Sequence, residues 1–316
     1  MGSGSRKDIA LLPYTRDSFL GSYASGYSKN YPSTIIADTF SSSLQLAFNY
    51  RLLSLLIYTH SYVINCQTHY RSRAWCMAWH GSWCWKFQIP ALEALGYAVE
   101  MVDLPCVSGV SGTTQFDDAD HVRSVVESQI SMGKRVVVLA HSYGGPIASA
   151  AIKGLSGNGV LGMIALSAFI FHGGMDQGAA IRDIGGLPYV MWDVPSEGLF
   201  QAKDPRGLFF PPDVSADLVD WAVPQLRPQS MAANMGIVPP QAWQDDSYTG
   251  RLGYIRCTAD VVIPIEQQDA MVEGAGGQWK WVVRTLEGSG HSPFLSRPHE
   301  VAAALEEMVN AFEARI

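Results

Sequence analysis

Residues 136–145 (VVVLAHSYGG) constrain the fold of this chain more than any other stretch. A run of β-branched apolar residues, which is typical of a buried strand, ends abruptly on Ser142 between Ala140 and Gly144. Small residues at these two positions let the backbone reverse tightly from the strand into a helix, which we expect over 145–153. Such a turn lifts the Ser142 hydroxyl above the edge of the sheet, where it is placed to act as a nucleophile.

A serine hydroxyl is a weak nucleophile, so it requires a base and a carboxylate that orients the base. The strand-like segment 252–257 leads into Asp260, and the alternating segment 279–286 leads into a glycine-rich loop that carries His291. All three polar residues thus follow predicted strands, at the edge where open α/β sheets bind ligands. We therefore expect Ser142, His291 and Asp260 to form a catalytic triad.

Other residues compete for two of these roles. His299 also follows the serine at a suitable distance, but it lies at the start of the last predicted helix, where an exposed position is expected. Asp245, Asp246 and Asp269 are alternative acids, although none of them directly follows an apolar strand. A turn or cap role remains the alternative for both His291 and Asp260.

Several segments match a known family in the family's order. They are 78–85 (AWHGSWCW), 102–105 (VDLP), 133–145 (GKRVVVLAHSYGG), 226–230 (LRPQS), 254–260 (YIRCTAD) and 290–294 (GHSPF). From Ala78 to Ile316 the chain resembles the α/β-hydrolases, closest to the branch with plant methyl-ester esterases, hydroxynitrile lyases and their microbial relatives. The resemblance implies a mostly parallel, doubly wound sheet with an inserted lid over about 171–250, and the alternation of strands and helices agrees.

The resemblance also implies an oxyanion hole made by two backbone N–H groups, each worth about 3–4 kcal/mol of barrier. One belongs to Tyr143, which follows the nucleophile. The other is expected from Ala78, although Cys76 and Met77 stand where relatives usually have His-Gly. We therefore expect Ala78 and Tyr143 to form the oxyanion hole.

The lid is rich in large apolar side chains, and it should determine which substrate reaches Ser142. Many of these side chains are expected only to pack the lid against the core. Ligand sites are mostly apolar with few polar groups, so some should line the substrate pocket. We expect the pocket to be lined by Trp79, His141, Trp192, Phe209, Phe210 and Met235.

Residues 1–73 do not resemble the family, and we place the hydrolase domain at 74–316. An apolar run at 52–65 has about 14 residues, fewer than the roughly 20 that a spanning helix needs. Three interpretations remain for this N-terminal extension: non-coding sequence translated across a splice junction, an extension packed on the core, or a membrane-surface segment. The abrupt start of the resemblance at Ala78 favours the first. If the extension supplies sheet strands, the apolar run is the part expected to be buried.

The net charge and the cysteine pattern of the chain restrict the kinds of molecule that it is expected to bind. The net charge of −7 and the absence of a basic run argue against nucleic acid or an anionic membrane. The five cysteines are scattered, without a Cys-x-x-Cys pair or a His/Cys cluster, which disfavours disulfides and a zinc site. We expect a cytoplasmic protein that needs no cofactor or metal and whose partner is a small-molecule substrate.

The predicted function is hydrolysis of a small to medium apolar or aromatic carboxylic ester, lactone or thioester. A serine nucleophile argues against the epoxide hydrolases and haloalkane dehalogenases, which use aspartate on this fold. One alternative is a non-hydrolytic lyase that cleaves a carbon–carbon bond with the same triad. Ser292 stands where hydroxynitrile lyases carry lysine, which disfavours cyanohydrin cleavage. A further alternative is a ligand-binding receptor on a hydrolase scaffold.

Overall fold

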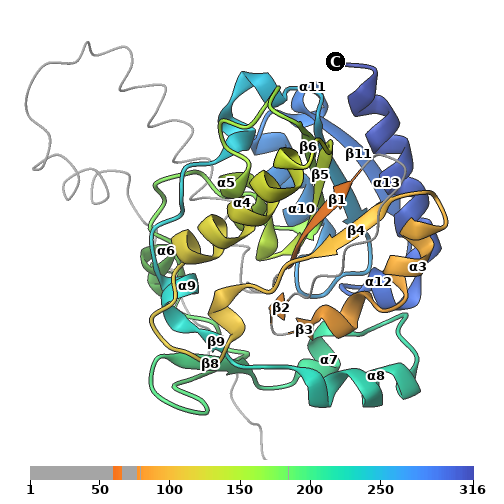
Figure 1. Ribbon diagram of the computed structural model, residues 1–316. Helices are drawn as coiled ribbons and strands as arrows, with labels where there is room; N and C mark the ends of the chain where they lie inside the picture. The colour runs from red at the N-terminus through yellow and green to blue at the C-terminus, as the bar shows by residue number, and fades with distance from the viewer. Residues whose placement is uncertain (1–59, 66–76, 79, 184) are drawn as a thin grey trace, which may run out of the picture. The chain divides into compact units, whose positions relative to one another are not determined.

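A six-stranded sheet forms the centre of the fold (Figure 1). The computed structural model describes residues 60–65, 77–78, 80–183 and 185–316, which all belong to one unit spanning 47–316. In sheet order the strands are β11 (Trp281–Leu286), β10 (Leu252–Cys257), β6 (Val160–Ala168), β5 (Val136–Ser142), β1 (His60–Asn65) and β4 (Ala98–Met101).

Five of these strands run in the same direction. Strands β5, β6, β10 and β11 pair in parallel, whereas β1 is antiparallel to both of its neighbours, β5 and β4. Every residue of β5 and β6 is buried, as expected for central strands that are covered on both faces. The predicted α/β-hydrolase fold with a mostly parallel sheet is confirmed.

Helices cover both faces of the sheet (Figure 1). Helices α3 and α13 contact each other on one face, and α4 and α5 pack together against β1 and β5 on the other. In the part of the chain that the structure describes, no helix combines the length and the apolar character needed to cross a bilayer. The helices outside the lid are α3 (Gln88–Glu93), α4 (Gln115–Ser131), α5 (Gly144–Ala151), α10 (Ile265–Gly274), α11 (Gly277–Lys280), α12 (Pro293–Ser296) and α13 (Pro298–Glu313).

One predicted strand is shorter than expected. The alternating segment 279–286 becomes strand only from Trp281, because Gly277–Lys280 form a helical turn. Gly276 and Gly277 both adopt positive φ angles, of 103° and 55°, which start this turn and which side chains would disfavour.

Strand β1 lies within the N-terminal segment 1–73. It forms the end of the apolar run and pairs along its whole length with β5, from His60 opposite His141 to Asn65 opposite Val136. The other residues of this segment lie outside the described residues. The domain boundary after residue 73 therefore stays a prediction, but at least this strand belongs to the central sheet.

The lid connects β6 to β10 and contains a small sheet of its own, in the order β7-β8-β9. In Figure 1, β8, β9, α7 and α8 gather at one end of the central sheet, in the lower part of the view. The regular elements of the lid are α6 (Gln177–Asp183), β7 (Val190–Trp192), β8 (Leu199–Ala202), α7 (Pro205–Phe209), α8 (Ala216–Ala222), β9 (Gln229–Ser230) and α9 (Met231–Met235).

Candidate active site

Ser142 lies at a sharp turn between β5 and α5. Its φ angle is +55°, a left-handed conformation that a residue with a side chain adopts only when the surrounding structure imposes it. The sequence pointed to close packing at Ala140 and Gly144, whereas the structure shows a close approach at Gly145, where an added Cβ would lie 2.2 Å from the carbonyl oxygen of Phe169. The turn therefore depends on a missing side chain at the start of the helix.

His291 bridges the serine and the carboxylate. Its Nε2 lies 3.1 Å from Ser142 Oγ, and its Nδ1 lies 2.6 Å from Asp260 Oδ2. Ser142 and His291 are fully buried, and Asp260 is 4% exposed. A carboxylate only accepts hydrogen bonds, so the proton of the neutral imidazole resides on Nδ1 and Nε2 is left to accept the serine proton. The structure thus brings the three predicted residues into one hydrogen-bonded chain.

The Asp260 carboxylate is held by four donors. Its Oδ1 accepts hydrogen bonds from the backbone N–H groups of Val262 and Ile263, at 2.7 and 3.0 Å. Its Oδ2 accepts from the Ser167 hydroxyl at 2.5 Å in addition to His291 Nδ1. A carboxylate fixed in this way keeps the imidazole in one orientation and favours a positive charge on it.

Sequence reasoning missed Ser167. Between β5 and β6 the pairing shifts from His141 opposite Leu166 to Ser142 opposite Ala168, so Ser167 is bulged out of the register. Its φ angle is +36°. Bulges at sheet ends redirect side chains, and here the hydroxyl points to the triad carboxylate. A serine at the end of an apolar strand was its only signal in the sequence.

His141 was expected to line the substrate pocket, and the structure places it against the backbone of His291. Its Nε2 lies 2.7 Å from the carbonyl oxygen of His291. Since a carbonyl only accepts, Nε2 carries the proton and donates it. The two imidazole rings are 4.4 Å apart, and His141 is fully buried. Its contacts support the neighbouring histidine.

Tyr143, which follows the nucleophile, is anchored in the core by its phenol. The hydroxyl donates to Asp118 Oδ2 at 2.9 Å, and Asp118 Oδ1 accepts from the backbone N–H of Cys106 at 2.9 Å. Burial raises the pKa of Asp118 to about 6, although hydrogen bonds from Cys106 and Tyr143 oppose the rise. Ala78 lies in the short strand β2 (Met77–Ala78), which pairs with β3 (His80–Gly81).

Two buried aromatic residues of the lid lie near the triad, and one of them contacts His291. Phe209 and Phe210, at the end of α7, are buried, and the Phe209 ring lies 6.3 Å from the His291 ring. Both phenylalanines meet His80 edge to face, at 5.1 and 5.8 Å between ring centres. Phe294 lies 6.3 Å from His80. Apolar and aromatic groups therefore surround one side of the triad.

For the three remaining expected pocket residues, the structure gives either local contacts within the lid or no description. Trp192 stacks on Phe200 within the small lid sheet, at 5.4 Å between ring centres. Met235 is half-buried at the end of α9. Trp79 lies outside the described residues. A role for these three in the pocket stays a prediction.

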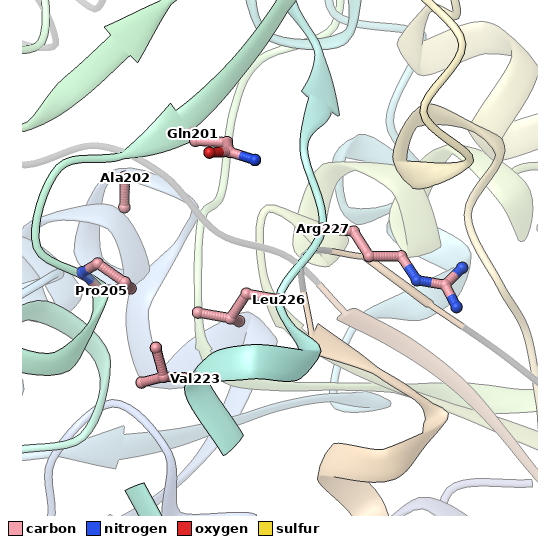
Figure 2. A pocket seen from close by; sticks show the side chains of 6 residues that line it. All are labelled: Gln201, Ala202, Pro205, Val223, Leu226 and Arg227. Carbon is pink, nitrogen blue, oxygen red and sulfur yellow. The ribbon is translucent and has the colours of Figure 1, made fainter. Parts of the chain in front are cut away.

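A small pocket of about 140 Å³ lies inside the lid, and Ser142, His291 and Asp260 are not among the residues that line it. Figure 2 shows Arg227 extending away from the other lining side chains. Ser142 and His291 themselves are fully buried. We therefore expect a movement of neighbouring segments when a substrate reaches the serine. The pocket is lined by Gln201, Ala202, Pro205, Val223, Leu226 and Arg227.

The sheet, the lid and the serine at the strand–helix turn define an α/β-hydrolase. The model of the alpha/beta hydrolase family matches residues 78–304. The chain belongs to this family and is an enzyme of the hydrolase class.

Similar proteins agree with this assignment. Norfluorocurarine synthase 2 from Strychnos is 25% identical over 73% of this chain and 92% of its own length. Methyl jasmonate esterase 1 from Vitis vinifera is 23% identical over 74% and 95%. The crystal structure of a methylesterase from Arabidopsis aligns with a TM-score of 0.58 at 20% identity, over 75% of this chain and 98% of that one. The structural likeness supports the fold, whereas the substrate has to be argued from the site.

Proposed function

We propose that the protein is a serine hydrolase that cleaves a small to medium apolar or aromatic carboxylic ester, lactone or thioester. The observation that carries the proposal is the hydrogen-bonded chain from Ser142 Oγ through His291 to Asp260, with distances of 3.1 and 2.6 Å. An accidental cluster would not also place the serine at a strained turn with a positive φ. Esterase names among the relatives agree with this class of substrate.

In the proposed mechanism, Ser142 Oγ attacks the carbonyl carbon while His291 Nε2 takes its proton. Asp260 stabilises the imidazolium, and the backbone N–H groups of Tyr143 and Ala78 bind the oxyanion. The imidazolium then protonates the leaving alcohol or thiol, and a water molecule, activated by the same histidine, releases the acid. These steps require no cofactor.

The aromatic surroundings support an apolar substrate. Phe209 and Phe210 lie beside His80, Phe209 also lies close to His291, and neither ring offers a charged group to a polar substrate. Burying an apolar group of the substrate there would stabilise the complex by about 25 cal/mol per Å² removed from water. A strongly anionic substrate would lose hydration without gaining a counter-charge from these rings.

A carbon–carbon lyase on the same triad is the second candidate, because the same three residues can transfer a proton without hydrolysing an ester. The position after His291 is Ser292, whose hydroxyl donates to the backbone carbonyl of Phe209 at 2.9 Å. The Ser292 side chain is therefore hydrogen-bonded to the lid. Turnover in ¹⁸O-labelled water distinguishes the candidates, because hydrolysis places one solvent oxygen in the acid product and lyase cleavage without hydrolysis does not.

A fluorophosphonate probe tests the proposal without knowledge of the substrate. We expect labelling of the wild type at Ser142, and no labelling or turnover of p-nitrophenyl esters in Ser142→Ala, because loss of a triad nucleophile removes several orders of magnitude in rate. A Ser149→Ala variant is the control, since this buried serine lies on α5 and contacts the Trp243 backbone. A Ser142→Ala variant that kept a tenth or more of the activity would place catalysis elsewhere.

A further inference from the structure

The segment that carries His291, residues 287–297, is held from two sides, and we refer to it as the histidine loop. From the core, His141 donates to the carbonyl oxygen of His291 at 2.7 Å. From the lid, the carbonyl oxygen of Phe209 accepts a hydrogen bond from Ser292 at 2.9 Å. The backbone on both sides of the imidazole is thus tied to segments that are distant in the sequence.

A single lid carboxylate makes most of the lid-side contacts. Asp213 Oδ1 accepts from the backbone N–H of Gly290 at 3.1 Å. Its Oδ2 is 2.9 Å from Ser296 Oγ, 3.0 Å from Arg297 Nε and 3.3 Å from Ser289 Oγ. The Asp213 side chain is only 12% exposed, so these charge-assisted hydrogen bonds are partly shielded from water.

The lid and the histidine loop also touch backbone to backbone at this point. A Cβ added to Gly290 would lie 1.9 Å from the carbonyl oxygen of Pro211, which precedes Asp213 by two residues. No residue larger than glycine fits at position 290 while the lid is seated. Gly290, the residue before His291, is therefore positioned by the lid as well as by its own loop.

We propose that Asp213 is a positioning residue that holds the histidine loop in the orientation aligning His291 with Ser142 and Asp260. This inference rests on the proposed function, because it assigns Asp213 to the same reaction. Asp213 bonds the residues before and after His291 and acts through the backbone of the loop. A displacement of about 1 Å in a catalytic group can cost roughly 100-fold in rate, which sets the scale of the effect.

The arrangement couples the lid to catalysis. Ser142 and His291 are fully buried, so substrate entry requires some segment around them to move. If the segment carrying Asp213 moves, the histidine loop loses its carboxylate anchor at the same time. The enzyme then becomes fully competent only when the lid is seated again, which restricts the reaction to a site closed to bulk water.

The test compares Asp213→Asn and Asp213→Ala with Asp245→Asn in the full-length protein. Asp245 is the control, because it is also a lid carboxylate with a salt bridge, to Lys153 at 2.5 Å, but this salt bridge joins the lid to the segment after α5 and not to the histidine loop. Two quantities are measured: amide hydrogen exchange of 287–297, and kcat per active site counted by fluorophosphonate labelling.

We expect faster exchange confined to the histidine loop in both Asp213 variants. We expect kcat per labelled site to fall about 10- to 100-fold, more for Ala than for Asn, with KM changed by less than about threefold. Asp245→Asn should leave both quantities within about twofold. A merely structural role would reduce the number of labelled sites and leave kcat per labelled site at its wild-type value.

Unchanged exchange and kcat in the Asp213 variants, or equal losses in the Asp245 control, would overturn the proposal. Wild-type kcat at each remaining labelled site would overturn it too. If the wild type itself is not labelled, the proposed function fails, and hydrogen exchange then decides the positioning role alone. Faster exchange of 287–297 would support that role, and unchanged exchange would refute it.

Discussion

The buried carboxyl of Asp118 gives a quantitative test of how the elbow is anchored. Asp118 is fully buried, and it accepts hydrogen bonds from the Tyr143 hydroxyl and the Cys106 backbone N–H. Burial raises its pKa from 3.8 to about 6. In Asp118→Asn the amide oxygen can accept from Cys106 and the amide nitrogen can donate to the Tyr143 oxygen. The substitution therefore removes the charge and keeps the shape.

The sign follows from which state binds the proton more tightly. A rise of about two pKa units corresponds to roughly 3 kcal/mol. Because the folded protein holds this proton more tightly than the unfolded chain, the contribution of Asp118 to stability is complete below pH 3.8 and is lost as the pH rises through about 6. The Asn variant has no proton to release at this position, so its stability does not fall in this way as the pH rises. Between about pH 4.5 and pH 7.5 its free energy of unfolding should therefore rise by about 2 kcal/mol relative to the wild type.

Urea denaturation of both proteins across this pH range measures the difference. Other titrating groups cancel in it, including Asp103, whose pKa is also raised to about 6 by burial. Asp117→Asn should show no such rise over this range, because hydrogen bonds from Thr114 lower the pKa of Asp117 below 3.8 and the stability that it contributes is lost only at a more acidic pH. A difference for Asp118→Asn that is flat or falls with rising pH would refute the reasoning.

Two further substitutions test the surroundings of His291. Ser167→Ala removes one donor to the Asp260 carboxylate, and kcat should fall about tenfold, since a hydrogen bond to a charged group is worth about 1.5 kcal/mol or more; an unchanged kcat would show that the other donors suffice. Gly290→Ala forces a Cβ against the Pro211 carbonyl, and it should destabilise the protein by about 1–3 kcal/mol and reduce kcat, as thermal unfolding and steady-state kinetics would show. If Gly290→Ala had the wild-type stability and the wild-type kcat, the lid would be able to shift away from the added Cβ without loss of free energy.

The parts of the fold that could be predicted are those indicated by the spacing of apolar residues within a single segment of the sequence. The apolar run before Ser142 is a strand buried along its whole length, because both faces of the central sheet are covered. The helical spacing of Val301, Leu305 and Phe312 marked the face of α13 that is buried. His291 and Asp260 were found because each follows a strand-like segment of the sequence, and the corresponding strands β11 and β10 run parallel to β5 in the central sheet.

The direction of β1 could not be read from the sequence. The apolar run was recognised as the part of the N-terminal segment that would be buried if it joined the sheet. An apolar strand carries no information about the direction in which it pairs, and β1 runs antiparallel between β4 and β5. Its place depends on long-range pairing, which local propensity does not encode.

Ser167 and Asp213 show why a catalytic site is larger than its motif. Ser167 reaches Asp260 only because the pairing of two strands shifts by one residue, which is a property of the assembled sheet. Asp213 lies far before His291 in the chain, and only the seated lid brings its carboxylate to the loop. A motif specifies the atoms that react, whereas the precision of their alignment comes from residues that touch no reacting atom. We therefore expect a lid substitution such as Asp213→Ala to lower kcat although the side chain touches no reacting atom, by less than the loss of Ser142 itself.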